Sequence, residues 1–136
     1  MSVAIHTRHA PEFPLPFSQA LVAGDFVYIS GQVGVDPATR QVIGDTIEEQ
    51  TTQTLRNIET ILHTAGLTLD HIVKIQSYLA RPEDVPGYNE AYRRLLKEPF
   101  PARTTITCGI GSYLIEIDAI AYAPAVRTEA PARSEA

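Results

Sequence analysis

The spacing of apolar residues changes several times along the chain, and this change constrains the fold more than any other feature. In two segments, apolar residues recur at intervals of three and four, which places them along one face of a helix. Before, between and after these segments, β-prone residues form short runs that are typical of strands. The resulting order is β-β-β-α-β-α-β-β. This order predicts an α+β fold with a mixed β-sheet and two helices packed on one of its faces.

Both predicted helices have recognisable ends. The first spans residues 46–65, where Thr46 followed by Glu49 fits a capping box, in which each side chain accepts a hydrogen bond from the other residue's backbone N–H. Gly66 supplies the glycine that commonly follows the last turn of a helix. The second helix is predicted within residues 82–96, because prolines suit its first turn and further prolines prevent its continuation.

The predicted strands lie in the remaining β-prone runs. Gly24 and Asp25 suit a tight turn between the second and third strands, so these two are expected to form a hairpin. Residues 31–44 contain several glycines and are expected to form a loop. The expected strands, in chain order, span residues 3–8, 20–23, 26–30, 72–80, 103–108 and 113–123.

Alternation within the later strands predicts one apolar and one mixed face of the sheet. Because successive side chains of a strand point to opposite faces, Glu116 and Asp118 are expected opposite the apolar residues of the last strand. The face under the helices is expected to carry Ile115, Ile117, Ala119, Ala121, Val73, Ile75, Leu79, Ile106 and Cys108, and the mixed face to carry Lys74, Gln76, Tyr78, Arg103, Thr105 and Thr107. The mixed face is too apolar for water and too polar for a core, so we expect self-association to cover it.

Length, charge and composition limit the class of protein. The 136 residues suit one domain, predicted over residues 1–123, whereas residues 124–136 hold too few apolar side chains to offset ordering entropy and are expected to be a flexible tail. A net charge of −5 without basic clusters argues against a nucleic-acid partner. The chain shows neither a transmembrane run nor a signal peptide, and its one cysteine suits a reducing compartment. A soluble, cytoplasmic protein with no membrane partner is expected.

Several kinds of catalytic site are not supported by the sequence. The four histidines lack the spacing of metal ligands, so we expect no metal. Cys108 has no histidine near it in the sequence and is interpreted as a buried, inert thiol. The serines lack a Gly-x-Ser-x-Gly motif and the glycines lack phosphate-loop spacings, so neither a serine nucleophile nor a nucleotide site is indicated.

Two charged residues remain as candidates for chemistry. Arg103 opens a predicted strand directly after Pro101 and Ala102, and its guanidinium could hold a carboxylate through two parallel hydrogen bonds; a surface arginine is the simpler alternative. Glu116 lies in mid-strand on the mixed face, where an unpaired buried carboxylate is costly. Glu116 could be one half of an ion pair or a general acid or base, and these residues alone leave both roles open.

Four short runs resemble, in order and spacing, the signature blocks of a known family. They are Tyr28-Ile29-Ser30-Gly31-Gln32, Asn89-Glu90-Ala91-Tyr92, Phe100-Pro101-Ala102-Arg103 and Leu114-Ile115-Glu116-Ile117. Together they resemble the Rid family, also called YjgF or reactive-intermediate deaminases, over about residues 10–123. The resemblance implies a chorismate-mutase-like single domain that assembles as a homotrimer, with the sheets facing one another around a central barrel.

The resemblance also implies an activity and a site. It implies clefts between subunits in which a small 2-imino or enamine acid, such as an imine derived from 2-aminoacrylate, is hydrolysed to a 2-oxo acid and ammonia without a cofactor. Arg103 would grip the substrate carboxylate, and Glu116 would position or activate water, roles that suit a bidentate cation and a carboxylate across a cleft. The implied substrate-binding residues are Phe17, Ser30, Gly31, Asn89, Arg103 and Thr105.

Three departures from the family pattern border the implied site. Phe17 stands where many relatives have a tyrosine, Thr104 stands where smaller residues are usual, and the loop over residues 107–113 is shorter than in typical members. Two alternatives therefore stay open. One is a pathway-specific deaminase of a larger unsaturated amino acid such as 2-aminomuconate, and the other is a non-catalytic small-ligand-binding or ribonuclease-like member.

Overall fold

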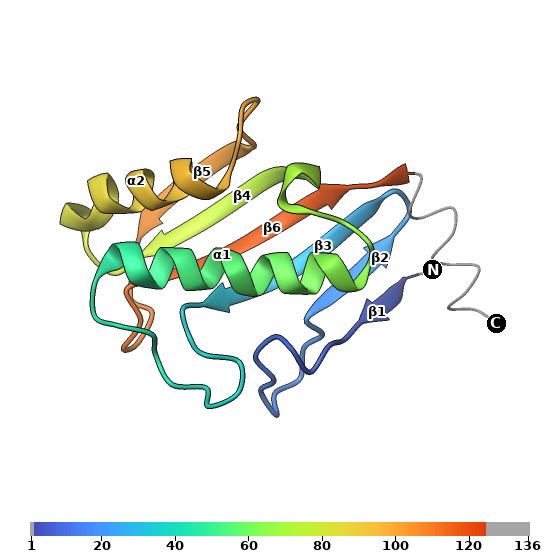
Figure 1. Ribbon diagram of the computed structural model, residues 1–136, viewed down its shortest axis with the longest axis horizontal. Coiled ribbons are helices and arrows are strands. Elements are labelled where there is room, and N and C mark those ends of the chain that lie inside the picture. The colour runs from blue at the N-terminus through green and yellow to red at the C-terminus, as the bar shows by residue number, and fades with distance from the viewer. Residues whose placement is uncertain (1, 125–136) are drawn as a thin grey trace.

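Six strands form one mixed sheet, and two helices cross one of its faces, in the computed structural model, which describes residues 2–124 (Figure 1). The elements are β1 (Val3–Ile5), β2 (Ala20–Ala23), β3 (Phe26–Val33), α1 (Ile47–Thr64), the 3₁₀ turn η1 (Leu69–His71), β4 (Ile72–Leu79), the 3₁₀ turn η2 (Pro82–Asp84), α2 (Val85–Leu95), β5 (Ala102–Thr107) and β6 (Ile115–Tyr122). The sheet order is β1-β2-β3-β6-β4-β5, in which β4 and β5 run parallel and the other neighbours antiparallel. The predicted fold class and element order are confirmed.

The first and third strands differ from their predicted lengths. β1 ends at Ile5, because the backbone N–H of Thr7 donates to the side-chain amide oxygen of Gln19 (2.8 Å) rather than to a neighbouring strand. β3 continues through Gly31 into the segment predicted to be a loop, with a register shift in its pairing with β6. The predicted tail, residues 124–136, lies outside the described residues except for Pro124.

Helix α1 begins at the predicted capping box. The backbone N–H of Glu49 donates to Thr46 Oγ1 (3.2 Å), and the backbone N–H of Thr46 donates to Glu49 Oε1 (3.3 Å). The helix ends before Gly66, whose φ of +77° is the left-handed conformation that glycine adopts without strain. Its apolar face packs on β3 and β6 and includes the fully buried Leu55, Ile58, Ile61 and Leu62.

Helix α2 packs beside α1 and covers the end of the sheet formed by β4 and β5 (Figure 1). Its buried residues are Tyr88, Ala91 and Tyr92. The Tyr88 hydroxyl shares a hydrogen bond with the hydroxyl of Ser77 on β4, which satisfies two polar groups inside the core. This bond and the apolar contacts around it hold α2 against β4 and thereby position the side chains that α2 presents toward β5.

One predicted face assignment on β4 is wrong. Val73 was expected under the helices with Ile75 and Leu79, but its side chain is 44% exposed. The pairing of β4 with β6 shifts register between Ile72 and Lys74, so Val73 falls outside the alternation that the rest of the strand follows. Ile75 and Leu79 are fully buried, as predicted.

The predicted faces of β5 are reversed. Arg103 pairs with the buried Ile75 of β4, and paired residues in neighbouring strands point to the same face, so Arg103 lies on the helix side. Thr105 and Thr107 share that side, whereas Ile106 is 46% exposed on the other face and Cys108 is only half-buried. β5 is an edge strand that extends beyond most of the core, so the core does not force its apolar residues inward.

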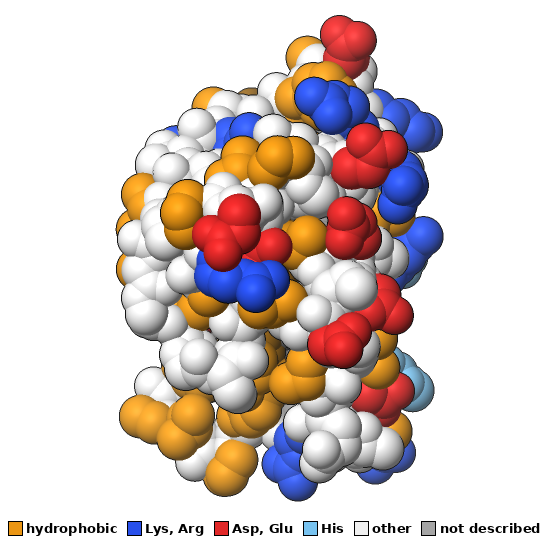
Figure 2. All heavy atoms as spheres, turned by 90° about the vertical axis from the view of Figure 1, so that its left-hand side faces the viewer, with side chains coloured by type: hydrophobic (Ala, Val, Ile, Leu, Met, Phe, Trp, Pro, Cys, Tyr) orange, Lys and Arg blue, Asp and Glu red, His pale blue; other side chains and the backbone are white. Residues whose placement is uncertain are grey.

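The sheet face opposite the helices is uncovered in this single chain and carries aromatic side chains. Phe26 contacts Tyr28 and Tyr122, with ring centroids 6.3 and 5.3 Å apart, and all three are exposed. In the space-filling view, charged side chains gather toward the helix side at the right, while the left edge shows mainly hydrophobic and other uncharged atoms (Figure 2). Exposed apolar surface of this kind is typical of an interface between proteins.

Candidate functional site

The Arg103 side chain lies over two tyrosine rings of helix α2. Its guanidinium carbon is 5.0 Å from the ring centroid of Tyr88 and 4.9 Å from that of Tyr92. Tyr88 and Tyr92 are four residues apart and therefore neighbours on one helix face, with ring centroids 5.5 Å apart in an edge-to-face arrangement. Cation–π attraction from both rings holds the guanidinium in place while its N–H groups stay available.

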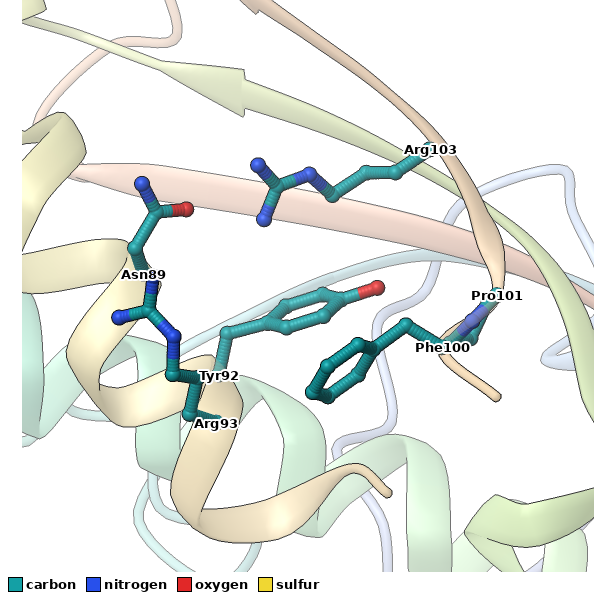
Figure 3. A pocket seen from close by; sticks show the side chains of 6 residues that line it. All are labelled: Asn89, Tyr92, Arg93, Phe100, Pro101 and Arg103. Carbon is teal, nitrogen blue, oxygen red and sulfur yellow. The ribbon is translucent and has the colours of Figure 1, made fainter. Parts of the chain in front are cut away.

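A pocket of about 270 Å³ adjoins this arginine and is lined by Asn89, Tyr92, Arg93, Phe100, Pro101 and Arg103 (Figure 3). Figure 3 shows Arg103 reaching from β5 across the ring of Tyr92 toward Asn89 on α2. No ion pair joins Arg103 to any carboxylate within residues 2–124. The pocket therefore combines a free guanidinium, an amide and an aromatic wall, a set of groups that suits a small carboxylic acid.

Two hydroxyl groups near Arg103 have no hydrogen-bond partner in the described part of the chain. The hydroxyl of Tyr92 is buried, although its ring lines the pocket, and Thr105 Oγ1 is buried two residues beyond Arg103 on the same side of β5. Burial, with a smaller contribution from Tyr88, raises the pKa of Tyr92 to about 12 against the opposing effect of Arg103. Tyr92 thus keeps its proton at neutral pH and can donate a hydrogen bond.

A second group of predicted site residues lies around the second half of β3. Phe17, Ser30 and Gly31 line a separate pocket of about 440 Å³ together with Asp118 of β6. The Ser30 hydroxyl donates to the backbone carbonyl of Ser18 (2.5 Å), which ties the segment before β2 to the strand. Phe17 is exposed, so its ring forms an outer wall of this pocket.

Glu116 lies directly against Gly31. A methyl group added at the Cα of Gly31 would collide with the Glu116 carboxylate, so the carboxylate can occupy its observed position only because residue 31 has no side chain. Burial, and to a lesser extent the neighbouring Asp118 carboxylate, raise the pKa of Glu116 above its ordinary value. Within the described residues Glu116 has no ion pair, which removes the ion-pair interpretation inside a single subunit.

Asp118 and Tyr78 form a polar pair beside Glu116 on the open face of the sheet. The Tyr78 hydroxyl donates to Asp118 Oδ2 (2.8 Å), and Tyr78 is the cross-strand partner of Glu116. The hydrogen bond to Asp118, followed by burial and the charges of Asp118 and Glu116, raises the pKa of Tyr78 to about 12. Tyr78 therefore stays protonated and fixes the Asp118 carboxylate next to Glu116.

Within one subunit, the structure does not bring the two predicted catalytic residues together. Arg103 shares its face with Ile75 under the helices, whereas Glu116 pairs with Tyr78 on the open face. The expectation that both lie on the mixed face is wrong, because the faces of β5 are reversed. Asn89 accompanies Arg103, while Phe17, Ser30 and Gly31 accompany Glu116.

Known proteins resemble this chain in sequence and in fold. The sequence model of the family described as Endoribonuclease L-PSP matches residues 7–123. The chain belongs to the Rid (YjgF) family. This Rid protein is 40% identical over 124 residues to a RutC family protein of Pyrococcus horikoshii, an alignment that covers 90% of this chain and 98% of the relative. The predicted family resemblance is confirmed.

Two further relatives carry more specific names. This Rid protein is 38% identical over 120 residues to the 2-iminobutanoate/2-iminopropanoate deaminase of Homo sapiens, with 86% of this chain and 87% of the relative covered. Its fold is similar to the crystal structure of RidA from an Antarctic Psychrobacter, with a TM-score of 0.83 and 34% identity over 88% of this chain and 98% of that chain. The match supports the sheet and helix arrangement described above.

Sequence reasoning missed several groups that form the pocket of this Rid protein. Tyr88 and Tyr92 are buried on the apolar face of the second helix, and their rings also hold Arg103. Their spacing of four residues, close to a block ending in arginine, is a signal that could have suggested such a stack. Arg93 carried no recognisable signal, because its position at the pocket depends on how α2 packs against β5.

Neither a metal-binding cluster nor a membrane-spanning helix occurs among the described residues. Between residues 2 and 124, no group of three or more His, Cys, Asp or Glu side chains is arranged to hold a metal ion. His6 Nε2 lies 2.7 Å from Glu12 Oε2 in an exposed pair that has no third ligand-type side chain within the part of the chain that the structure describes. In the same part of the chain, neither helix has the length and apolar character needed to cross a bilayer.

Proposed function

We propose that this Rid protein hydrolyses reactive 2-imino acids, and the enamines that interconvert with them, to 2-oxo acids and ammonia. The observation that carries the proposal is the Arg103 guanidinium, which has no ion pair within residues 2–124 and lies over two tyrosine rings where it lines a small pocket. A 2-imino acid presents a carboxylate beside the reacting carbon, which is the group that a fixed guanidinium binds in a bidentate manner. The deaminase name of the human relative supports the same choice.

In the proposed reaction, water adds to the carbon of the C=N bond and the C–N bond then breaks. The oxygen of water becomes the carbonyl oxygen of the 2-oxo acid, and the nitrogen leaves as ammonia with the protons that water supplies. Arg103 fixes the carboxylate next to the reacting carbon. Glu116, whose pKa is raised, takes a proton from the attacking water and returns it to the departing nitrogen.

The proposed site is completed between subunits of a homotrimer. Arg103 and Glu116 lie on opposite faces of one sheet, so neither face of a single subunit presents both residues. The uncovered face, with exposed Phe26, Tyr28 and Tyr122, supplies apolar surface for such an assembly. In this arrangement the Arg103 group of one subunit faces the Glu116 group of its neighbour.

The activity can be tested with imines generated in place by an amino-acid oxidase. Semicarbazide reacts with the imine that has not been hydrolysed, so a smaller amount of semicarbazone reports hydrolysis by the added protein. The wild-type protein is expected to accelerate this loss and Arg103→Ala to abolish the acceleration. Arg94→Ala is the matched control, because Arg94 pairs with Glu90 on the outside of α2 (3.5 Å) and does not line the pocket. Equal rates for Arg103→Ala and wild type would contradict the proposal.

The endoribonuclease description of the family raises a second possibility that the pocket does not favour. A volume of about 270 Å³ suits a small acid rather than a polynucleotide. The net charge of −5 opposes association with a phosphate backbone. Salt-dependent RNA binding or cleavage that persists in Arg103→Ala would favour a ribonuclease instead.

A further inference from the structure

The arginines around helix α2 fall into two pairs that differ in their contacts. Arg81 donates to both carboxylate oxygens of Asp84 (2.9 and 3.1 Å), and Arg94 lies 3.5 Å from Glu90. Arg93 and Arg103 form no ion pair with any residue from 2 to 124. These two unpaired arginines are also the two that line the pocket beside α2.

The pocket therefore holds two cations and no carboxylate. Asn89 and Arg93 are separated by four residues on α2, so they lie on one helix face, and Figure 3 shows Arg103 extending toward that face from β5. None of the six lining residues is acidic. In a chain whose net charge is −5, two neighbouring guanidinium groups without a counter-charge create a local positive potential.

Two aromatic residues also line this pocket. Tyr92 and Phe100 line the pocket, with ring centroids 6.2 Å apart, and because Tyr92 is buried while Phe100 is 44% exposed, Phe100 offers most of the aromatic surface. A ligand in the pocket can thus meet two cations and the apolar surface of Phe100. The chemistry that fits is a short carbon chain with an anionic group at both ends.

We propose that the preferred substrates are 2-imino acids that carry a second carboxylate on the side chain. This inference rests on the proposed deaminase function and specifies its substrate class. Arg103 binds the carboxylate next to the imine carbon, Arg93 binds the distal carboxylate, and the exposed ring of Phe100 offers apolar surface to the carbons of the substrate. Asn89 supplies an amide that can hydrogen-bond either end.

The test compares two imines that differ in the distal carboxylate. Amino-acid oxidases generate one imine from glutamate and the other from 2-aminobutanoate, and kcat/KM is measured for both with wild type, Arg93→Gln and the control Arg94→Gln. The ratio of kcat/KM for the diacid imine to that for the monoacid imine is expected to fall roughly tenfold or more in Arg93→Gln, because a charge-assisted hydrogen bond is lost. Arg94→Gln should leave the ratio at the wild-type value.

A binding measurement separates this inference from the proposed function. The dissociation constants of 2-oxoglutarate and 2-oxobutanoate are measured by calorimetry with the same three proteins. If imines are hydrolysed but Arg93→Gln changes neither the kinetic ratio nor the relative affinity, the inference is wrong and the deaminase function stands. If no imine is hydrolysed but Arg93→Gln selectively weakens the binding of 2-oxoglutarate, the deaminase function is wrong, and the conclusion that the pocket binds diacids stands. A wild-type protein that binds 2-oxoglutarate no better than 2-oxobutanoate would also overturn the inference.

Discussion

Arg103 and Glu116 point to opposite faces of the same sheet. Arg103 pairs with Ile75 across β4 and β5 and rests on the tyrosines of α2, whereas Glu116 pairs with Tyr78 on the uncovered face. Two groups proposed to act on one small substrate are therefore separated by the sheet within each subunit. The proposed reaction therefore requires that Arg103 of one subunit lie close to Glu116 of another, and this requirement can be tested.

The first prediction is that two inactive variants complement each other. Arg103→Ala and Glu116→Gln are each expected to be inactive alone, but in mixed homotrimers a cleft can combine an intact Arg103 from one subunit with an intact Glu116 from the other. Random mixing of equal amounts should restore roughly a quarter of the wild-type activity. Sedimentation should give three times the 14.9 kDa subunit mass. A trimeric mixture with no recovered activity would mean that Arg103 and Glu116 of each cleft come from the same subunit.

The second prediction concerns the geometry of the carboxylate clamp. Arg103→Lys keeps the positive charge but replaces a planar guanidinium with a single ammonium group, so kcat/KM should fall by about 10²-fold or more. The stack on Tyr88 and Tyr92 should weaken as well, because the flat guanidinium covers both rings. Steady-state kinetics with an oxidase-generated imine provides the measurement. A lysine variant with near wild-type kcat/KM would show that charge alone suffices.

The third prediction assigns a pH dependence to Glu116. A general base must be deprotonated, and burial and Asp118 raise the pKa of Glu116, so activity should fall as the pH drops through a value above the ordinary ~4.3 of glutamate. Glu116→Gln should lower kcat by about 10²–10⁴-fold and remove this acidic limb, while 2-oxo acid binding survives. If Glu116 has only a structural role, the variant should instead keep its rate per intact trimer and change the melting temperature or sedimentation mass.

The fourth prediction tests the contact between β3 and Glu116. Gly31→Ala places a methyl group where the Glu116 carboxylate lies, and the carboxylate can move away because it ends a flexible side chain. The fold should therefore persist while the displaced acid lowers kcat by about 10²-fold. Gly109→Ala is the control for thermal stability, since its added methyl group meets open space. A wild-type kcat in Gly31→Ala would show that catalysis does not depend on this close approach.

The fifth prediction separates the two tyrosines under Arg103. Tyr88→Phe removes the partner of the buried Ser77 hydroxyl and should lower the free energy of unfolding by about 1–3 kcal/mol. Tyr92→Phe removes a buried hydroxyl that has no partner among residues 2–124, so stability should be unchanged or higher. Chemical denaturation of both variants checks the contrast. Equal destabilisation by the two substitutions would mean that Tyr92 bonds a group contributed by another subunit.

The sequence by itself determined the elements whose signals are local. The spacing of apolar residues predicted both helices, Thr46 and Glu49 marked the start of α1, and Gly66 marked its end. Alternation in β6 correctly separated the buried Ile115 and Ile117 from Glu116, because a strand in the middle of the sheet has its apolar face held against the core. The four signature blocks likewise predicted the family, since they depend only on residue types and order.

Tertiary structure alone decided which face each side chain of β5 presents. Alternation assigns side chains to two faces but does not say which face is which, and an edge strand with few core contacts has no apolar majority to decide the choice. The decision came from long-range packing, because α2 offers Tyr88 and Tyr92 as a surface on which the Arg103 guanidinium can stack. The register shift at Val73 and the approach of Gly31 to Glu116 also arise from pairing between distant strands, which local spacing does not encode.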